Sequence, residues 1–352
     1  MSLPELIINK RIVNLSSPTY FIAEVSCNHN QDKQTALKLI YEAYKAGADA
    51  VKLQTYTPDT ITIKCDKPIF KDCLKGSIWE GQTLYDLYSS AYTPWEWHKE
   101  LKEYANSLGL DLLSSPFDTT AVDFLETLDI PVYKIASFEI TDHILLKRIA
   151  QTKKPAIISS GMASLSELND AVSILRDNGT TQLCMLKCTS AYPAKPEDAN
   201  LITIKHMAET FGIVTGLSDH TLGVEVPIAS VILGARIIEK HFTLSRDSGS
   251  ADDAFSLLPN EFKEMVDAIR IIEKTIGKIT YAGVINESSS KKFRRSLFVV
   301  EDIKKGEQLT ETNVKSIRPS NGLHTRYYDE IIGKFANQDI DRGTPLNWNL
   351  FG

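Results

Sequence analysis

The chain has 352 residues, of which 43% are hydrophobic and 24% charged, and its formal net charge at pH 7 is -6. This composition predicts a soluble globular protein, long enough for one large domain and one small one. The acidic balance and the lack of a basic stripe argue against nucleic acid as a partner.

Membrane insertion and secretion are also not expected. No apolar run approaches transmembrane length, and polar residues interrupt the start of the chain where a signal peptide would need an apolar segment. The five cysteines are odd in number and lack zinc-type spacing. We therefore expect reduced thiols in a cytoplasmic protein.

One pattern recurs after a short predicted hairpin at Leu6–Leu15 that could plug the base of the following domain. An apolar, β-rich run ends in polar residues and is followed by a helical segment. The runs are Tyr20–Ser26, Ala50–Tyr56, Leu110–Phe117, Val132–Ser137, Pro155–Gly161, Leu183–Thr189, Val214–His220 and Arg236–Thr243. Eight strands alternating with helices predict parallel pairing and a closed (β/α)8 TIM barrel.

Helix signals lie between these runs. Thr35–Ala46 is a predicted helix, and Thr93–Glu96 has the form of a capping box with proline at the first helical position. Ser164–Glu167 is predicted to begin another helix, and Glu261–Ile276 is the last one of the barrel.

One connection, Thr57 to Tyr92, is unusually long. Long structured loops in compact domains are often functional, and this one carries Trp79, Tyr85 and Tyr88. It could wall the pocket, or it could be a packed surface insertion.

The end of the chain differs in composition from the barrel. Residues 284–292 are polar and serine-rich, which is typical of a linker. We expect a barrel domain at 1–283 and a separate small β-rich domain at 293–352, which is short enough that it should dock on something.

Two histidines, His220 and His241, follow the seventh and eighth apolar runs. If these runs are parallel strands, both imidazoles emerge at the barrel face where the chemistry of TIM barrels lies. Two neutral imidazoles facing one point can hold a divalent metal, with water and a substrate oxygen as further ligands. The alternative is two unrelated histidines bound to loop carbonyls.

Polar side chains occur at the ends of all eight runs. Besides the histidines of the last two runs they are Glu24, Asn28, His29, Lys52, Gln54, Ser114, Ser115, Lys134, Ser137, Glu139, Ser159, Ser160, Lys187, Thr189, Ser190, Tyr192, Ser218, Asp219, Glu239 and Lys240. Charges inside apolar strands are costly unless they are paired or serve a ligand. The lysines and hydroxyls favour a phosphate or carboxylate ligand, and the carboxylates with Gln54 favour a polyhydroxylated one. The alternative is an internal ion-pair network, and Lys240, which alternates with His241, could simply face the helices.

These segments resemble the sialic acid synthase family. The resemblance rests on IAEVSCNHN, GADAVKLQTY, LSSPFD, YKIASFE, ISSGMAS, LKCTSAYP, GLSDHTLG and IIEKHFTL, and on SLFVVEDIKKGEQLT, RPSNGLH and IDRGTPL, which resemble its antifreeze-like (SAF) domain. Such enzymes condense phosphoenolpyruvate with an N-acetylated amino sugar to form a nine-carbon 2-keto acid. The resemblance therefore implies a TIM barrel followed by a SAF domain, and phosphoenolpyruvate and the sugar as partners.

Within the family, EVSCNHN, TPWEWH and DDAFSLLP resemble the pseudaminic acid branch more than the sialic or legionaminic acid branches. Two positions depart from that branch: Leu258 stands where glutamate is usual, and Ser320 where glycine is usual. The expected substrate is thus 2,4-diacetamido-2,4,6-trideoxy-β-L-altrose, with the neuraminic and legionaminic acid precursors as alternatives.

The resemblance also implies roles for individual residues. His220 and His241 match the ligands of a divalent metal, Mn²⁺ or Mg²⁺, that polarises the sugar aldehyde. Glu24 is our candidate acid/base. Positions that bind phosphoenolpyruvate match Lys52, Ser115, Lys134, Ser137, Ser159, Ser190 and Ser218, and positions around the sugar match Gln54, Glu139, Tyr192 and Asp252. Arg318 matches an arginine that a partner subunit's SAF domain inserts over the site, which implies a domain-swapped homodimer.

Two other classes of function remain as rivals. Lys187 could be the nucleophile of a Schiff-base aldolase, since a desolvated lysine can form such an adduct. The chain could also be a non-catalytic sugar- or ice-binding protein built around its C-terminal module.

Overall fold

The structure is a computed structural model that describes residues 4–77, 79–281 and 285–352. The chain forms two compact units, Met1–Gly277 and Lys278–Gly352. The boundary predicted at residue 283 lies outside the described residues. Among the residues described, none of the helices combines the length and the apolar composition that crossing a membrane requires.

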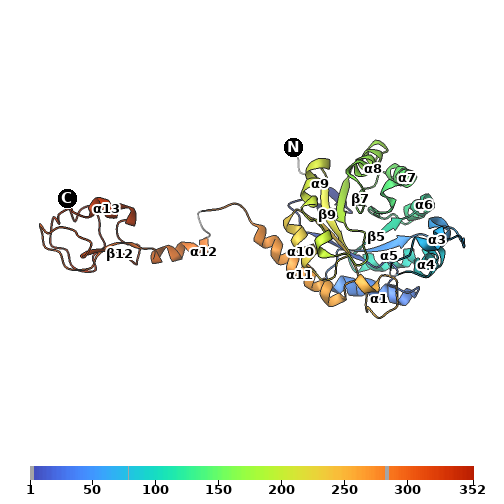
Figure 1. The fold of residues 1–352 in the computed structure, drawn as a ribbon, viewed down its shortest axis with the longest axis horizontal. Coiled ribbons are helices and arrows are strands. Elements are labelled where there is room, and N and C mark those ends of the chain that lie inside the picture. The colour runs from blue at the N-terminus through green and yellow to red at the C-terminus, as the bar shows by residue number, and fades with distance from the viewer. Residues whose placement is uncertain (1–3, 78, 282–284) are drawn as a thin grey trace. The chain divides into compact units, whose positions relative to one another are not determined.

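The first unit is a closed barrel of eight parallel strands (Figure 1). They are β3 (Tyr20–Glu24), β4 (Ala50–Thr55), β5 (Asp111–Pro116), β6 (Tyr133–Ile135), β7 (Ala156–Ser159), β8 (Leu183–Cys188), β9 (Val214–Asp219) and β10 (Ile237–His241). Each strand pairs with its neighbour in sequence, and β10 closes the barrel on β3 with Ile237 opposite Tyr20 and His241 opposite Glu24. The predicted TIM barrel is confirmed, because each predicted run contains one of these strands.

The base of the barrel is filled by apolar side chains. The N-terminal hairpin, β1 (Leu6–Ile8) and β2 (Arg11–Val13), turns at Asn9, whose φ is 51°. Its buried Leu6, Ile8 and Val13 belong to the same core as the inward-facing residues of the strands, among them Tyr20, Ile22, Val132, Ile157 and Ile237. The hairpin therefore plugs the end of the barrel at which the strands begin.

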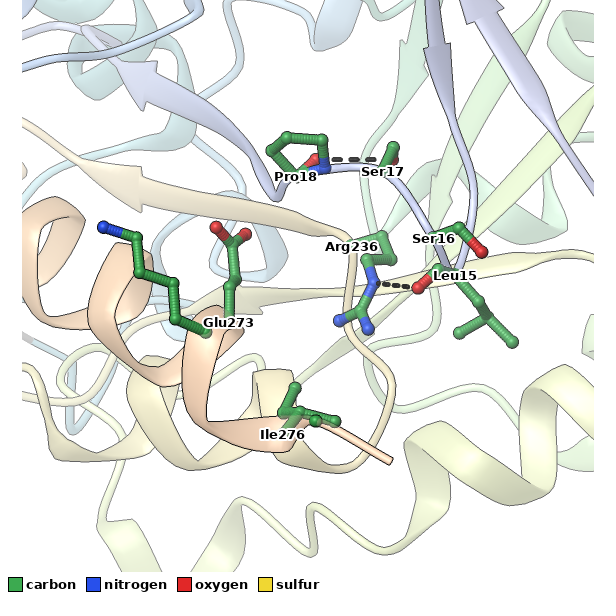
Figure 2. Close-up of a pocket in the computed structure, with 9 residues that line it drawn as sticks. Leu15, Ser16, Ser17, Pro18, Arg236, Glu273 and Ile276 are labelled. Atoms are coloured by element: carbon green, nitrogen blue, oxygen red, sulfur yellow. Dashed lines mark hydrogen bonds between the residues drawn. The ribbon is translucent and has the colours of Figure 1, made fainter. Parts of the chain in front are cut away.

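A cavity of about 400 Å³ lies on this same end (Figure 2). Leu15 and Pro18 precede β3, Arg236 precedes β10, and Glu273 and Ile276 belong to the end of the last barrel helix. The Arg236 guanidinium donates to the Leu15 carbonyl at 3.1 Å. The cavity is thus on the opposite face from the polar strand ends and takes no part in the site described below.

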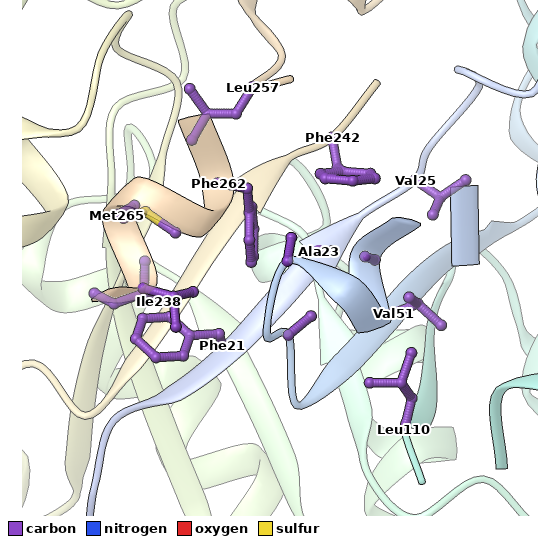
Figure 3. Close-up of a cluster of buried hydrophobic side chains, with 14 of the residues drawn as sticks. Phe21, Ala23, Val25, Val51, Leu110, Ile238, Phe242, Leu257, Phe262 and Met265 are labelled. Carbon is purple, nitrogen blue, oxygen red and sulfur yellow. The ribbon is translucent and has the colours of Figure 1, made fainter. Parts of the chain in front are cut away.

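The barrel helices cover the outer face of the sheet. They are α1 (Lys33–Lys45), α5 (His98–Ser107), α6 (Thr119–Thr127), α7 (His143–Gln151), α8 (Leu165–Asp177), α9 (Thr203–Phe211), α10 (Glu225–Ile232) and α11 (Pro259–Ile276). Figure 3 shows how Phe21, Ala23 and Ile238 of the sheet lie against Phe262 and Met265 of α11. Strand residues alternate between this outer core and the barrel interior, so each strand buries both faces.

Side-chain caps fix where several helices begin. The predicted capping box at Ser164 is present, with Glu167 as its reciprocal partner. The predicted capping box at Thr93 is wrong: a 3₁₀ turn, η1 (Trp95–Trp97), precedes α5, and Pro94 occupies its N-cap without a side-chain bond. The Thr93 hydroxyl instead hydrogen-bonds to Nε2 of the buried His29 at 2.9 Å.

The long connection after β4 folds into three short helices, α2 (Pro58–Ile61), α3 (Ile69–Asp72) and α4 (Leu84–Ala91). Its Trp79 indole N–H donates to the Ala251 carbonyl at 3.1 Å. The connection is therefore tied to the segment that follows β10, at the face of the barrel where the strands end.

The second unit has its own small core. It contains α12 (Ile285–Ser288), η5 (Ser289–Phe293), an antiparallel pair β11 (Ser296–Val299) and β12 (Val314–Ile317), η6 (Thr325–Tyr327) and α13 (Tyr328–Ile331). Leu297, Leu309, Ile340 and Leu350 are among its buried residues. The segment predicted as a linker is 284–292, and its described part, 285–292, is thus helical.

Candidate active site

Four charged side chains meet inside the barrel at the strand ends. Glu24, Lys52, Lys134 and Glu239, called here the four-charge cluster, are each at most 4% exposed. The Lys52 ammonium lies 2.8 Å from Glu24 Oε2 and 3.6 Å from Glu239 Oε1, and the Lys134 ammonium lies 3.4 Å from the same Glu239 oxygen. Alternation places them inward, since Tyr20, Ile22 and Glu24 of β3 share one face.

The charges in this cluster stabilise one another. Burial raises the pKa of Glu239, but Lys134 and Lys52 outweigh it and bring that pKa down to about 2. Burial lowers the pKa of Lys52, and the carboxylates of Glu239 and Glu24 more than offset this. The pKa of Lys134 is lowered, mainly by burial. The cluster is electrically balanced before any ligand arrives, with two ammonium groups and two carboxylates.

A layer of serine hydroxyls surrounds the lysines. Ser159 accepts from Lys134 at 2.8 Å and Ser115 from Lys52 at 3.3 Å. The other predicted members also lie here: Ser190 donates to Ser137 at 2.8 Å, and Ser218 donates to Glu239 at 3.1 Å. Hydroxyls and ammonium groups together suit an anionic ligand.

Gly161 keeps this layer open. Its φ is +47°, and a Cβ there would lie 2.3 Å from Ser137 Cβ and 2.9 Å from Ser190 Oγ. A side chain at this position would therefore fill the space between the two serines, which makes glycine a steric requirement of the site.

The two predicted histidines are neighbours. The ring centroids of His220 and His241 are 5.3 Å apart, and both residues are buried. His220 Nδ1 lies 2.8 Å from the Thr189 carbonyl, which can only accept, so Nδ1 carries a proton and, in the neutral ring, Nε2 keeps its lone pair. His241 Nδ1 lies 3.4 Å from Asp252 Oδ2. The His220 ring is held through Nδ1 by a neighbouring oxygen, the arrangement common to metal-binding histidines, whereas His241 Nδ1 is buried beside Asp252 without a hydrogen bond.

The imidazole pair fits a divalent ion that takes further ligands from outside the protein. Within the described part of the chain, no group of three or more His, Cys, Asp or Glu side chains forms a metal site. His220 and His241 would supply two nitrogens to such an ion, and water and substrate oxygens would complete its shell.

Of the residues predicted to surround the sugar, Tyr192 and Asp252 lie beside the histidines. The ring of Tyr192 is 4.4 Å from that of His220 and 5.7 Å from that of Trp79. Gln54 donates to Glu24 Oε1 at 2.9 Å. Glu139 has a buried oxygen, Oε2, without a hydrogen-bond partner, and burial raises its pKa to about 7. Through Trp79 the long connection reaches Tyr192 at the strand ends.

Sequence reasoning missed Cys188. Its thiol lies beside His220; burial raises the pKa of the thiol, but the hydrogen bond and positive charge of His220, when that ring is protonated, lower it overall. A signal was present, because Cys188 alternates with Leu186, which faces the barrel interior. Lys187 lies on the opposite face of β8 and donates to the Cys188 carbonyl at 2.9 Å, away from the histidines. This placement does not support Lys187 as an aldolase nucleophile.

Two further predictions concern residues outside the cluster. Lys240 faces away from the barrel interior, as its alternation suggested, and forms a fully buried ion pair with Asp219 at 2.5 Å. Arg318 lies in the second unit, after β12, where it is exposed and precedes a cis bond to Pro319.

Comparison with known proteins gives the family. A model of the NeuB family matches residues 39–281, and a SAF domain model matches residues 294–351. The chain is 46% identical to a pseudaminic acid synthase of Helicobacter pylori over 333 residues, which cover 94% of this chain and 97% of the relative. It is also 46% identical to a pseudaminic acid synthase of Campylobacter jejuni over 338 residues, covering 96% and 98% of the two chains.

Solved structures agree with this. The crystal structure of the spore coat polysaccharide biosynthesis protein SpsE of Bacillus subtilis is 32% identical, superimposes with a TM-score of 0.68, and the match covers 99% of each chain. The family match spans most of the barrel, and the site residues predicted from the family resemblance, apart from Arg318, gather at its strand ends. The chain belongs to the NeuB family and carries a C-terminal SAF domain.

Proposed function

We propose that this protein is a pseudaminic acid synthase. It condenses phosphoenolpyruvate with 2,4-diacetamido-2,4,6-trideoxy-β-L-altrose and water, and it releases pseudaminic acid and phosphate. The observation that carries the proposal is the pair of imidazoles, 5.3 Å apart, beside two buried lysines and a layer of serines. The substrate follows the names of the 46% identical relatives.

The lysines and serines bind phosphoenolpyruvate. Lys52 and Lys134 supply two positive charges, and Ser115, Ser137, Ser159, Ser190 and Ser218 supply hydroxyls for the phosphate and carboxylate oxygens. Their hydrogen bonds to one another fix these groups before the ligand arrives. A ligand held at both anionic ends presents its C3 carbon in one orientation.

His220 and His241 hold Mn²⁺ or Mg²⁺. When bound there, the ion would supply a Lewis acid for the carbonyl oxygen of the open-chain sugar. The Thr189 carbonyl orients the His220 ring, and Asp252 lies 3.4 Å from Nδ1 of His241 on the neighbouring strand end.

Glu24 acts as the general base when water attacks. C3 of phosphoenolpyruvate attacks C1 of the aldehyde, whose C=O π bond opens to an alkoxide; positive charge develops at C2, water adds to C2, and the proton that this water releases ends on the alkoxide. Glu24 accepts the proton of that water, because its carboxylate lies at the end of β3 beside Lys52. The resulting hemiketal phosphate loses phosphate by cleavage of the C2–O bond. In ¹⁸O-labelled water the label should enter the keto acid; label in the released phosphate would refute C–O cleavage.

Gln54, Glu139, Tyr192 and Asp252 contact the sugar, and Arg318 from a second copy completes the site in a domain-swapped homodimer. A guanidinium offers several donors to an acetamido oxygen. All five cysteines are free thiols, which fits the reducing cytoplasm as the compartment.

A product assay tests the proposal. The metal-loaded protein is incubated with phosphoenolpyruvate and, separately, the altrose substrate, its legionaminic acid precursor isomer and N-acetylmannosamine. Phosphate release and a new nine-carbon acid should be greatest with the altrose sugar. Preference for another sugar would refute the substrate assignment, and no release with any sugar would refute the synthase activity. A mixture of the R318A variant and the H241A variant should recover part of the wild-type activity if each site takes residues from two copies of the chain.

A further inference from the structure

Ser26 has an unusual backbone conformation. Its φ is 47°, in the left-handed region that L-residues with a side chain rarely adopt. Seven non-glycine residues in the described part of the chain have positive φ, and among these only Ser26 is buried, with 2% of its surface exposed. The other six are all exposed: Asn9, Asn30, Gln31, Asp129, Lys153 and Asn200.

The Ser26 hydroxyl joins two residues of the candidate sugar site. It accepts a hydrogen bond from Gln54 Nε2 at 2.9 Å and donates to Asp252 Oδ2 at 2.5 Å. The same Asp252 oxygen lies 3.4 Å from His241 Nδ1. One hydroxyl therefore connects the ends of β3 and β4 with the segment that follows β10.

This hydroxyl also fixes the orientation of the Gln54 amide. One amide N–H donor of Gln54 is directed at Glu24 Oε1 and the other at Ser26 Oγ, each at 2.9 Å. With both donors engaged, the Gln54 carbonyl oxygen is left to face a ligand. The ligand group at this point must then be a donor, which is a hydroxyl or an amide N–H of the sugar.

We propose that Ser26 is a positioning residue, whose hydroxyl holds Gln54 and Asp252 in place and is retained despite a backbone conformation that favours glycine. The inference rests on the proposed function for the identity of the sugar. Strained residues persist where the surroundings over-determine them, and they concentrate at functional sites. At Ser26 the surroundings that fix the conformation are two hydrogen bonds, to Gln54 and Asp252, which only a hydroxyl in this position can make together.

Two substitutions separate the hydroxyl from the strain. Ser26→Ala removes the hydroxyl and keeps a Cβ in the left-handed region, whereas Ser26→Gly removes both. Ser26→Gly should therefore melt about 2 °C higher than Ser26→Ala. Lys153, with a φ of 61° at an exposed turn, provides the matched pair Lys153→Ala and Lys153→Gly, which should differ in the same direction.

Kinetics then show what the hydroxyl does. Both Ser26 variants should lose between about 10- and 100-fold in kcat/KM for the amino sugar, since loss of such supporting contacts has effects of this size. Their KM for phosphoenolpyruvate should stay within about twofold of wild type, because Ser26 makes no contact with Lys134 or the serine layer. The Lys153 variants should match wild type. Full activity in Ser26→Gly, or equal losses for both substrates, would overturn the proposal.

A binding measurement keeps the test independent of turnover. Mn²⁺ titration followed by electron paramagnetic resonance should show about tenfold weaker binding in both Ser26 variants, because Asp252 loses its anchor beside His241. If wild type condenses none of the sugars but the Ser26 variants still bind Mn²⁺ more weakly, the proposed function fails and the positioning role stands. Unchanged Mn²⁺ affinity together with unchanged sugar kinetics would refute the role itself.

Discussion

Substitution of Glu239 by glutamine should destabilise the barrel in a way that phosphate reverses. Glu239→Gln changes the net charge of the four-charge cluster from 0 to +1. Lys52 keeps Glu24 at 2.8 Å, whereas Lys134 loses the one carboxylate that lies within 4 Å of it in the described structure and keeps only Ser159 as a hydrogen-bond partner. One buried charge is therefore left unpaired.

The expected loss of folding free energy follows from this one unpaired charge. Removing one partner of a buried ion pair costs about 3–5 kcal/mol, and because the glutamine retains an acceptor oxygen we expect about 3 kcal/mol. A phosphate ion bound by the lysines would replace the missing negative charge. If its affinity rises tenfold in the variant, saturating phosphate restores about 1.4 kcal/mol more than it adds to wild type.

Denaturant unfolding with and without phosphate, at matched ionic strength and pH 8, measures both effects. Asp219→Asn is the matched control, because it also leaves a buried lysine, Lys240, without its carboxylate, but on the outer side of the barrel. The control should be destabilised to a similar degree and should gain no more from phosphate than wild type. Equal phosphate effects in wild type and Glu239→Gln would refute an anion site at these lysines.

Three further outcomes follow from the site. Gly161→Ala should raise the KM for phosphoenolpyruvate between about 10- and 100-fold, since its Cβ would displace Ser137, whose Cβ lies 2.3 Å away; an unchanged KM would place the phosphate elsewhere. His241→Gln should weaken Mn²⁺ binding more than about 100-fold and abolish condensation, measured by metal titration and phosphate release, and wild-type affinity would contradict the metal assignment. Because burial raises the pKa of Glu139 from 4.5 to about 7, the folded protein holds a proton that the unfolded chain releases in this range, so wild type should lose about 3 kcal/mol of stability from pH 4.5 to 7. Glu139→Gln should lack this loss in pH-dependent melting; identical pH profiles would show that Glu139 titrates normally.

Sequence patterns predicted the parts of the structure that repeat along the chain. The eight strands and the inward positions of Lys52, Lys134 and His241 follow from alternation, because each strand buries one face in the barrel and the other under helices. The capping box at Ser164 was readable because its partner Glu167 lies three residues away.

Contacts between distant segments could not be read in this way. The Thr93 hydroxyl bonds to His29, which is 64 residues away, so a local capping motif gave the wrong partner. Ser26 reaches Asp252 across 226 residues, and nothing in the local sequence shows that its φ is positive. Cys188 lies by His220 only because β8 and β9 are neighbours in the closed sheet.

The apolar hairpin at the base of the barrel closes the interior at that end. Leu6, Ile8 and Val13 close the side where the strands begin, so molecules reach the lysines from the opposite side, where the histidines and Tyr192 lie. A deeply seated first substrate is then trapped beneath the second one and cannot exchange while the second is in place. Kinetics should accordingly be ordered, with phosphoenolpyruvate first, and excess sugar should inhibit by occupying the entrance too early.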